Sequence, residues 1–346
     1  MKAAVLYAND DIRYEDYETP VIGKNDNGSV IVKVHAAGIC GSDVPRVLYN
    51  GSHYYPNVLG HEFAGEIVDM GGSVTGIAVG DKVAAAPLIP CMRCGDCQKG
   101  SYSLCKNYSF IGSREQGGFA EYVKLPAANA VKFDPDISFE QGALFEPSTV
   151  ALHGLRTNGF CGGCDTAILG GGTIGLFTMQ WAKIFGAKSV TVFDVSEKRL
   201  ELCKKLGADH TVNTKTENMT LRKNAYHYIF ETAGVTKTMQ MSFELAGNKA
   251  NICFIGTPTH DLTFAPELFE NMNRKEFKLT GSWMSYSAPF PGEEWTLTAY
   301  YFKTGQLKFD EDIIFKRFDL SETGQAFALY KTPEAVKGKI LLTIPE

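Results

Sequence analysis

The chain has 346 residues, of which 44% are hydrophobic and 21% charged, and its formal net charge is −5 at pH 7. A chain of this length is too long to fold around one ordinary hydrophobic core, so we predict a globular protein with two domains. The sequence has no long basic run, which argues against nucleic-acid binding. The apolar N-terminal run is too short for a signal peptide, and no stretch is long enough to span a bilayer, so we expect a cytoplasmic protein without a membrane partner.

The N-terminal region, to about residue 125, has the pattern of a β domain. Short apolar-alternating runs at residues 30–35, 66–70 and 81–86 lie between glycine and proline turns. Strands of this length and spacing predict a small barrel or sandwich.

Nine cysteines without a secretion signal favour free thiols and metal ligands over disulfides. Four of them share one pattern, Cys91-Met-Arg-Cys94-Gly-Asp-Cys97 followed by Cys105. Four thiolates at this spacing close a tetrahedron around zinc and leave no position for water. We therefore predict a lobe at about residues 91–105 held by a structural zinc, with an iron–sulfur site as the alternative.

From residue 165 onward, strands and helices alternate. Strands are predicted at residues 166–170, 189–193, 226–231, 250–255 and 277–280, and helices at 176–185 and 196–206, the latter capped by Ser196 and ended by Gly207. This alternation predicts a doubly wound parallel sheet. A helix at 293–303 and a strand at 339–344 follow, and we expect this tail to pack back on the first domain. The predicted domains are residues 1–148 with 290–346, and residues 149–289.

A glycine loop joins the first strand of this sheet to its helix. Gly170-Gly-Gly172-Thr173-Ile174-Gly175 follows a strand, opens a helix and precedes an acid, Asp194, by about twenty residues, which is the full dinucleotide-binding context. Gly170 would make the turn, Gly172 would admit the pyrophosphate, and Gly175 would let the helix pack closely. Asp194 would accept hydrogen bonds from the ribose hydroxyls, which favours NAD over NADP, although Lys198 and Arg199 weaken this preference.

Three side chains predict a catalytic metal. Cys40, His61 and Glu146 supply a thiolate, an imidazole and a carboxylate, and the fourth position would take water or a substrate oxygen. A zinc ion there would acidify an alcohol and so favour hydride transfer to a nicotinamide. Glu62 is the alternative third ligand or a partner that supports the site. The alternative to a metal-binding role for Glu146 is that it is a solvent-exposed acid in a loop.

Two further side chains can move a proton. Ser42 lies two residues from Cys40, close enough to take the proton of a substrate hydroxyl, unless it only bonds its own turn backbone. His53 is a possible later member of the same relay. Cys161-Gly-Gly-Cys164 lies in a turn, where we favour two free thiols over a thioredoxin-like redox pair.

Taken together, these motifs resemble the zinc-dependent medium-chain alcohol and polyol dehydrogenases over essentially the whole chain. The motifs are Cys40-Gly-Ser-Asp43, Gly60-His-Glu62, the four-cysteine lobe, Glu146-Pro and the glycine loop with Asp194. The resemblance implies a GroES-like catalytic domain, a Rossmann domain, two zinc ions, NAD, and a homodimer, with a tetramer left open. It also implies that Thr232, Gly256 and Thr257 line the adenosine and nicotinamide pockets, and that Glu146 is the third ligand, as in the sorbitol and threonine branch.

Three longer strings narrow the resemblance to the polyol-phosphate branch: Asn50–Pro56, Phe110–Tyr122 and Gly281–Trp295. They imply NAD-linked oxidation of galactitol 1-phosphate to tagatose 6-phosphate. A sugar phosphate needs cationic donors, for which Arg46 and Arg114 are candidates. The candidates for lining the polyol pocket are Tyr49, Trp283 and Tyr286. The alternatives are an unphosphorylated polyol such as sorbitol, a pentitol phosphate or threonine as substrate, and, more remotely, a non-catalytic NAD-binding redox sensor.

Overall fold

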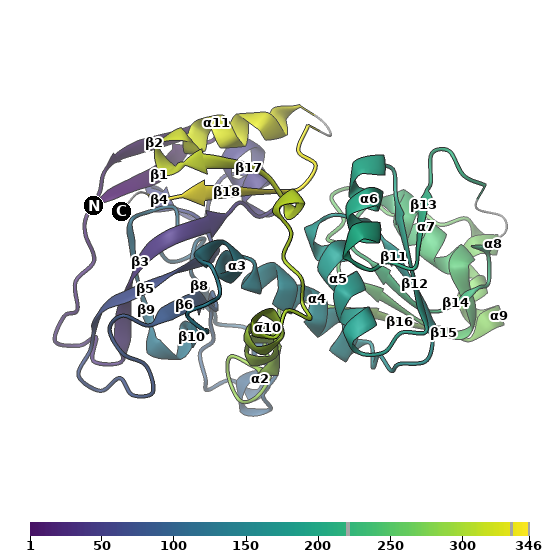
Figure 1. Ribbon diagram of the computed structural model, residues 1–346, viewed down its shortest axis with the longest axis horizontal. Helices are drawn as coiled ribbons and strands as arrows, with labels where there is room; N and C mark the ends of the chain where they lie inside the picture. The colour runs from purple at the N-terminus through teal and green to yellow at the C-terminus, as the bar shows by residue number, and fades with distance from the viewer. Residues whose placement is uncertain (219–221, 333–334, 345–346) are drawn as a thin grey trace. The chain divides into compact units, whose positions relative to one another are not determined.

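The computed structural model describes residues 1–218, 222–332 and 335–344. The chain forms two compact units, which Figure 1 shows with their elements labelled. One comprises Met1–Glu146, Tyr286–Gly305 and Phe309–Glu346, and the other Pro147–Ser285 and Gln306–Lys308. None of the described helices is both long enough and apolar enough to cross a membrane.

Residues 286–289 belong to the first unit, although the sequence-based boundary placed them in the second. The reason is aromatic packing, because Tyr286 stacks on Phe290 and lies against Trp295. The side chains of Tyr286 and Trp295 are buried.

The first unit contains three sheets, with strand orders β2-β1-β4, β10-β6-β5-β3-β18-β17 and β7-β8, and β9 also pairs with β3. Its strands are β1 Lys2–Ala8, β2 Asp11–Asp16, β3 Ser29–Gly38, β4 Asn57–Val58, β5 Glu62–Met70, β6 Lys82–Ala85, β7 Leu88–Ile89, β8 Ser109–Phe110, β9 Tyr122–Pro126, β10 Ala130–Lys132, β17 Ile314–Asp319 and β18 Lys339–Thr343. Its helices are α1 Asp43–Pro45, α2 Gly95–Gln98, α3 Phe139–Ala143, α10 Glu293–Lys303 and α11 Thr323–Ala328, and a π-helical turn spans Arg46–Asn50. Helix α4, Phe145–Thr157, begins in this unit and continues into the second.

Strand β3 is the centre of the largest sheet. It pairs antiparallel with β5, β9 and β18, and its apolar side chains are almost all buried. The pairing of β18 with β3 confirms that the C-terminal tail returns to the first domain. Figure 1 shows this return, with the yellow β18 beside the purple β3.

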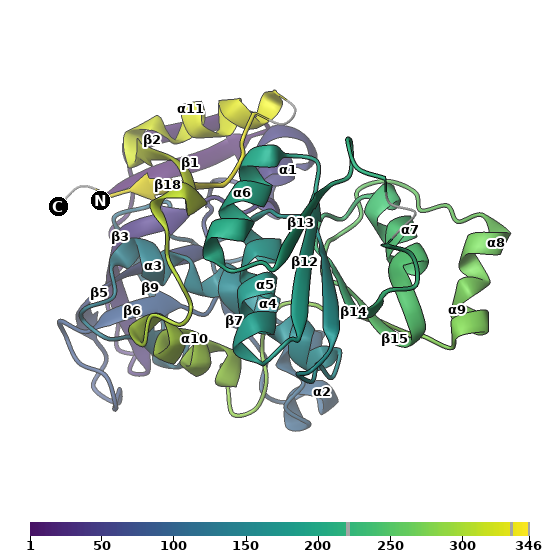
Figure 2. The ribbon, with the colours of Figure 1, turned by 45° about the vertical axis from the view of Figure 1, so that its right-hand side comes forward.

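The second unit is a six-stranded sheet of order β13-β12-β11-β14-β15-β16, in which every pairing is parallel. The strands are β11 Asp165–Leu169, β12 Ser189–Asp194, β13 His210–Asn213, β14 Tyr226–Glu231, β15 Ala246–Phe254 and β16 Lys278–Gly281. The helices are α5 Thr173–Ile184, α6 Glu197–Leu206, α7 Thr236–Leu245, α8 Pro266–Phe269 and α9 Asn271–Lys275. Figures 1 and 2 show α5 and α6 on one face of the sheet and α7 on the other.

The strand order of this sheet reverses next to β11, because β12 lies on one side of it and β14 on the other. Such a switch point, at the carboxyl ends of parallel strands, is where doubly wound sheets bind ligands. The predicted fold is confirmed, and the glycine loop lies at this point. Strand β13 was not predicted, because it is a four-residue edge strand with polar residues at both ends.

Two glycines of the loop differ in what surrounds them. A Cβ on Gly175 would overlap the carbonyl oxygen of Gly170, whereas a Cβ on Gly172 would meet nothing within 4 Å. Gly175 is therefore required for packing of α5 against the loop, and Gly172 is not.

We predict that Gly175→Ala destabilises the protein by about 1–3 kcal/mol, the usual cost of overpacking, and lowers its urea midpoint. Gly172→Ala is the matched control and should keep the wild-type midpoint. Equal midpoints for the two variants would show that the helix does not depend on this close approach.

Candidate functional site

Cys40, His61 and Glu62 come together at one end of β3 and β5. These strands are antiparallel neighbours with Gly38 opposite Glu62, so the residues after β3 lie beside those at the start of β5. The ligand atoms of the three side chains all lie within 4.8 Å of one another. A thiol, an imidazole and a carboxylate at this spacing match the donor set that zinc prefers.

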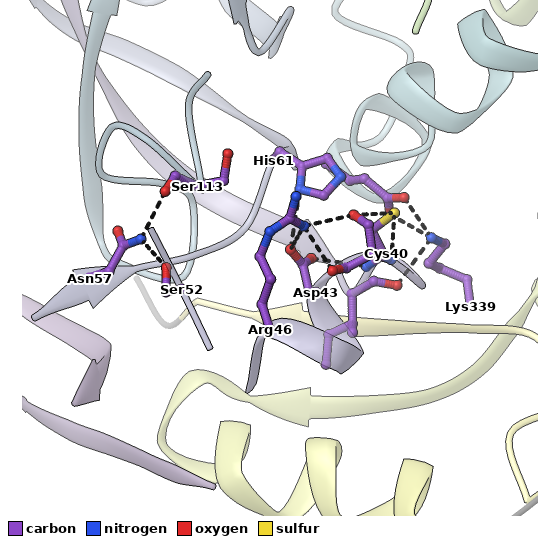
Figure 3. A network of polar contacts seen from close by, with 11 residues as sticks. Cys40, Asp43, Arg46, Ser52, Asn57, His61, Ser113 and Lys339 are labelled. Atoms are coloured by element: carbon purple, nitrogen blue, oxygen red, sulfur yellow. Dashed lines mark hydrogen bonds and ion pairs between the residues drawn. The ribbon is translucent and has the colours of Figure 1, made fainter. Parts of the chain in front are cut away.

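Asp43 orients His61 within this cluster (Figure 3). Its Oδ1 lies 3.4 Å from His61 Nδ1, and its Oδ2 accepts a hydrogen bond from the Cys40 N–H at 3.2 Å. Burial alone would lower the pKa of His61, but the charges of Asp43 and Cys40 outweigh it and raise this pKa well above its ordinary value. With Nδ1 facing a carboxylate, Nε2 remains for a metal, the usual arrangement of a ligating histidine.

Lys339 holds Glu62 from the last strand of the chain. Its Nζ donates to Glu62 Oε1 at 2.8 Å, to Oε2 at 2.5 Å and to the Ile39 carbonyl oxygen at 3.2 Å. Both side chains are buried. Burial would lower the pKa of Lys339, but Glu62 and Cys40 together raise it above its ordinary value. Both carboxylate oxygens of Glu62 therefore accept hydrogen bonds from the Lys339 ammonium group.

Glu146 lies in the first turn of α4 and is half-buried. It is not part of the three-residue ligand cluster found among the described residues. Burial raises the pKa of Glu146 to about 7; Glu62 and Asp43 act in the same direction, and His61 and Lys339 oppose them. Glu146 is thus a partly buried acid whose pKa is affected by the charges around His61, and it is not the exposed loop acid of the alternative interpretation.

Ser42 and Arg46 lie directly beside Cys40. The Ser42 hydroxyl donates to Cys40 Sγ at 3.4 Å, and Arg46 Nη1 donates to Ser42 Oγ at 3.1 Å and to its carbonyl oxygen at 2.8 Å. Ser42 thus contacts Cys40 directly, and Arg46 adds a positive charge next to it.

The charges of Arg46 and Arg114 both act on His53. Burial, then the positive charges of Arg114 and Arg46, lower the pKa of His53 below its ordinary value. Buried Asn57 joins the segments that carry His53 and Arg114. Its Nδ2 donates to Ser52 Oγ at 2.7 Å and to the Ser113 carbonyl oxygen at 3.0 Å (Figure 3). Among the described residues, Arg114 has no ion-pair partner, and its contacts are with Tyr108.

The four lobe cysteines also converge. The Sγ atoms of Cys91, Cys94, Cys97 and Cys105 all lie within 4.8 Å of one another. Hydrogen bonding from the backbone of Cys97 lowers the pKa of the Cys94 thiol to about 6, which favours the thiolate that a metal requires. The lobe packs on the segment after residue 285, where Ser103 Oγ accepts from the Tyr286 N–H at 3.2 Å.

The glycine loop and the predicted cofactor residues gather at the carboxyl edge of the parallel sheet. The N-cap of α5 is Gly172, and no side chain caps it, so the helix N–H groups are available to an anion. Asp194 ends β12; its Oδ2 accepts from the Gly171 N–H at 2.7 Å, and Arg199 lies 3.8 Å from the same oxygen. Thr232 Oγ1 donates to the Leu169 and Gly170 carbonyl oxygens at 3.0 and 3.1 Å.

The remaining predicted residues are placed as follows. Tyr49 and Trp283 are exposed, whereas Tyr286 is buried and its hydroxyl accepts from the Leu88 N–H at 2.9 Å. Cys161 and Cys164 are free thiols, as predicted. Ser196 and Gly207 are the N-cap and C-cap of α6, as predicted. The Ser196 side chain makes no capping hydrogen bond, and its N–H donates to Asp194 Oδ1 at 2.8 Å.

Sequence reasoning missed two residues that support the site. Asp43 had a local signal, because it stands three positions after Cys40 in the string Cys-Gly-Ser-Asp. Lys339 had none, because its partner Glu62 lies 277 positions away in sequence.

Two family models match the chain, the alcohol dehydrogenase GroES-like domain over residues 26–135 and the zinc-binding dehydrogenase over residues 173–298. Galactitol 1-phosphate 5-dehydrogenase of Escherichia coli (strain K12) is 40% identical over 348 residues, covering 99% of both chains. Sorbitol dehydrogenase of Bacillus subtilis (strain 168) is 32% identical over 280 residues, 75% of this chain and 76% of that protein. The crystal structure of galactitol-1-phosphate dehydrogenase from Escherichia coli has a TM-score of 0.93 at 39% identity, covering 99% of this chain and 100% of that one.

The two matched regions contain the elements described above. The GroES-like match includes Cys40, His61 and the cysteine lobe, and the zinc-binding dehydrogenase match begins at the first residue of α5. The relatives extend over both units. This chain therefore belongs to the zinc-binding, medium-chain alcohol dehydrogenase family, with a GroES-like domain and a Rossmann-type domain.

Proposed function

We propose that this protein is a zinc- and NAD-dependent dehydrogenase of a sugar-alcohol phosphate, with galactitol 1-phosphate as substrate and tagatose 6-phosphate as product. The observation that carries the substrate class is a pair of positive charges, Arg46 and Arg114, which both act on His53, with Arg46 also bonded to Ser42 beside Cys40. The identity of 40% with a galactitol 1-phosphate 5-dehydrogenase supports the specific choice.

Cys40, His61 and Glu146 would hold the catalytic zinc. The bonds from Lys339 to both oxygens of Glu62 favour Glu146 as the third ligand, since Glu62 would have to give up a buried ion pair to bind metal. Cys91, Cys94, Cys97 and Cys105 would hold a second, structural zinc.

Bound zinc and NAD would supply the electrophile that acidifies the substrate hydroxyl and the acceptor of the hydride. The chain's own residues position the substrate and move the proton. Ser42 Oγ lies 3.4 Å from Cys40 Sγ, where it would accept the proton of the substrate hydroxyl. The lowered pKa of His53 keeps its imidazole neutral near pH 7, so His53 would accept that proton next.

Arg46 and Arg114 would bind the phosphate. The phosphate on carbon 1 is remote from the hydroxyl that reacts on carbon 5, so it needs donors beyond the metal ligands. Arg114 is exposed and its guanidinium lies over the Tyr108 ring, 4.3 Å from the centroid, which leaves its charge available to an anion.

The buried carboxylate of Asp194 supports NAD over NADP, because it would repel a 2′-phosphate and Arg199 already lies against it. Thr232, Gly256 and Thr257 would line the pockets for the cofactor. By the same resemblance we propose a cytoplasmic homodimer, with a tetramer as the alternative.

The proposed function predicts the outcome of a substrate screen with the zinc-loaded protein. We expect NAD reduction with galactitol 1-phosphate at a higher kcat/KM than with galactitol, sorbitol, arabitol phosphate or threonine, followed by NADH absorbance. Cys40→Ser should abolish turnover while the circular dichroism spectrum stays unchanged. Greater activity on an unphosphorylated polyol or on threonine would show that galactitol 1-phosphate is not the preferred substrate. NADH binding without any turnover would favour the alternative of a non-catalytic redox sensor.

The arginine assignment predicts a selective loss in Arg114→Gln. Removing one charge-assisted contact should raise KM for galactitol 1-phosphate by about 10–100-fold and leave KM for unphosphorylated galactitol unchanged. Arg13→Gln is the matched control, because Arg13 pairs with Asp11 on β2. A KM that rises equally for both substrates would argue against a phosphate contact.

The cysteine lobe predicts a loss of metal in Cys97→Ser. We expect about one zinc fewer per chain and a lower thermal midpoint, because binding of a structural metal contributes to folding stability. Cys161→Ser, which removes an exposed thiol outside the cluster, should change neither quantity. Unchanged zinc content in Cys97→Ser, measured by plasma emission spectrometry, would contradict the structural site.

A further inference from the structure

Glu231 is a fully buried acid to which the proposed reaction assigns no role. It ends β14, opposite Leu169 of β11, and its side chain has no exposed surface. Its Oε1 accepts hydrogen bonds from the Ala233 N–H at 2.9 Å, the Gly234 N–H at 2.9 Å and the Thr238 hydroxyl at 2.7 Å. Three donors on one oxygen offset much of the cost of burying this carboxyl group.

The same residue also joins the loops that follow β14 and β15. Its carbonyl oxygen accepts from the Ile255 N–H at 2.9 Å and the Gly256 N–H at 3.0 Å. A Cβ on Gly256 would lie 2.7 Å from Glu231 Oε2, so the two loops pack on each other with the carboxyl group between them. A Cβ on Gly234 would likewise lie 2.5 Å from the Thr257 carbonyl oxygen.

These loops also connect to the glycine loop. Thr232, the next residue after Glu231, donates through its N–H to Leu169 and through its hydroxyl to Leu169 and Gly170. Glu231 therefore contacts the loop after β14 through its carboxyl group and the loop after β15 through its carbonyl oxygen, and the adjacent Thr232 contacts the glycine loop.

The two oxygens of the carboxyl group are used unequally. Oε2 is buried and has no hydrogen-bond partner among the described residues, whereas Oε1 has three. Burial raises the pKa of Glu231, and its three donors oppose this shift. What the structure uses is therefore the acceptor geometry of Oε1, which a glutamine side chain reproduces.

We infer that Glu231 is a positioning residue for the dinucleotide: its Oε1 holds residues 233 and 234. Because Gly234 packs on Thr257, the same contacts keep residues 256–257 in the conformation that binds the cofactor. This inference rests on the proposed cofactor site. The carboxyl group acts through the backbone of these loops and does not itself contact the cofactor.

The test compares Glu231→Leu with Glu231→Gln in the full-length, zinc-loaded protein. Dissociation constants for NADH are measured by fluorescence, and amide exchange of residues 232–235 and 255–258 by mass spectrometry. Losing three acceptor contacts should raise the NADH Kd at least about 10-fold in the leucine variant, whereas glutamine should stay within about 3-fold of wild type. Loop amides should exchange faster only in the leucine variant.

Thr166→Val is the control for general damage to the sheet. Thr166 lies on neighbouring β11, and its buried hydroxyl has no hydrogen-bond partner among the described residues. This variant should keep the wild-type NADH Kd. Where Glu231→Leu fails to fold, Thr238→Val, which removes one of the three donors, should still raise the NADH Kd about 2–5-fold.

An NADH Kd in folded Glu231→Leu equal to that of wild type would overturn the inference, and so would a loss of affinity that glutamine does not rescue. An unchanged Kd in Thr238→Val would overturn it when the leucine variant is unfolded. Wild-type protein that binds neither NADH nor NADPH would instead contradict the proposed function, so the two failures are distinguishable.

Discussion

The geometry of the candidate metal site at Cys40 and His61 depends on one buried ion pair, Lys339 with Glu62. Burying two charges is costly unless their hydrogen bonds are saturated, and here Lys339 donates to both carboxylate oxygens and to the Ile39 carbonyl. Ile39 immediately precedes Cys40, and Glu62 immediately follows His61. The pair thus fixes the backbone next to both ligands from a third strand, β18. Because β18 is the last strand, this wall of the site is completed only when the tail has returned to β3.

The same pair separates the roles of the acids around His61. Asp43 faces Nδ1 of the imidazole, Glu62 faces Lys339, and Glu146 lies in the first turn of α4. Burial raises the pKa of Glu146, and a cation bound at Cys40 and His61 would favour its charged form. These contacts agree with the proposal that Glu146, and not Glu62, would bind a metal at this site.

The features that could be predicted from sequence are those whose partners are close along the chain. The cysteine lobe, the glycine loop and the strands of the parallel sheet carry their spacing or periodicity within about thirty residues. Lys339 and Glu231 could not be found in this way, because a lysine at the start of a strand and an acid at the end of one have no local signal. Their roles follow from contacts across the sheets. The packing of the Tyr286 ring on Phe290 and Trp295 is likewise a contact that motif spacing does not reveal.

We propose that Lys339 retains Glu62, so that Glu146 is the third ligand of a zinc ion bound at Cys40 and His61. A crystal structure of the zinc-loaded protein, with anomalous differences collected at the zinc edge, tests it directly. We expect an anomalous peak bonded to Cys40, His61 and Glu146, with the Lys339–Glu62 pair intact. A peak bonded to Glu62, with Lys339 displaced from it, would show that Glu62 is the third ligand instead.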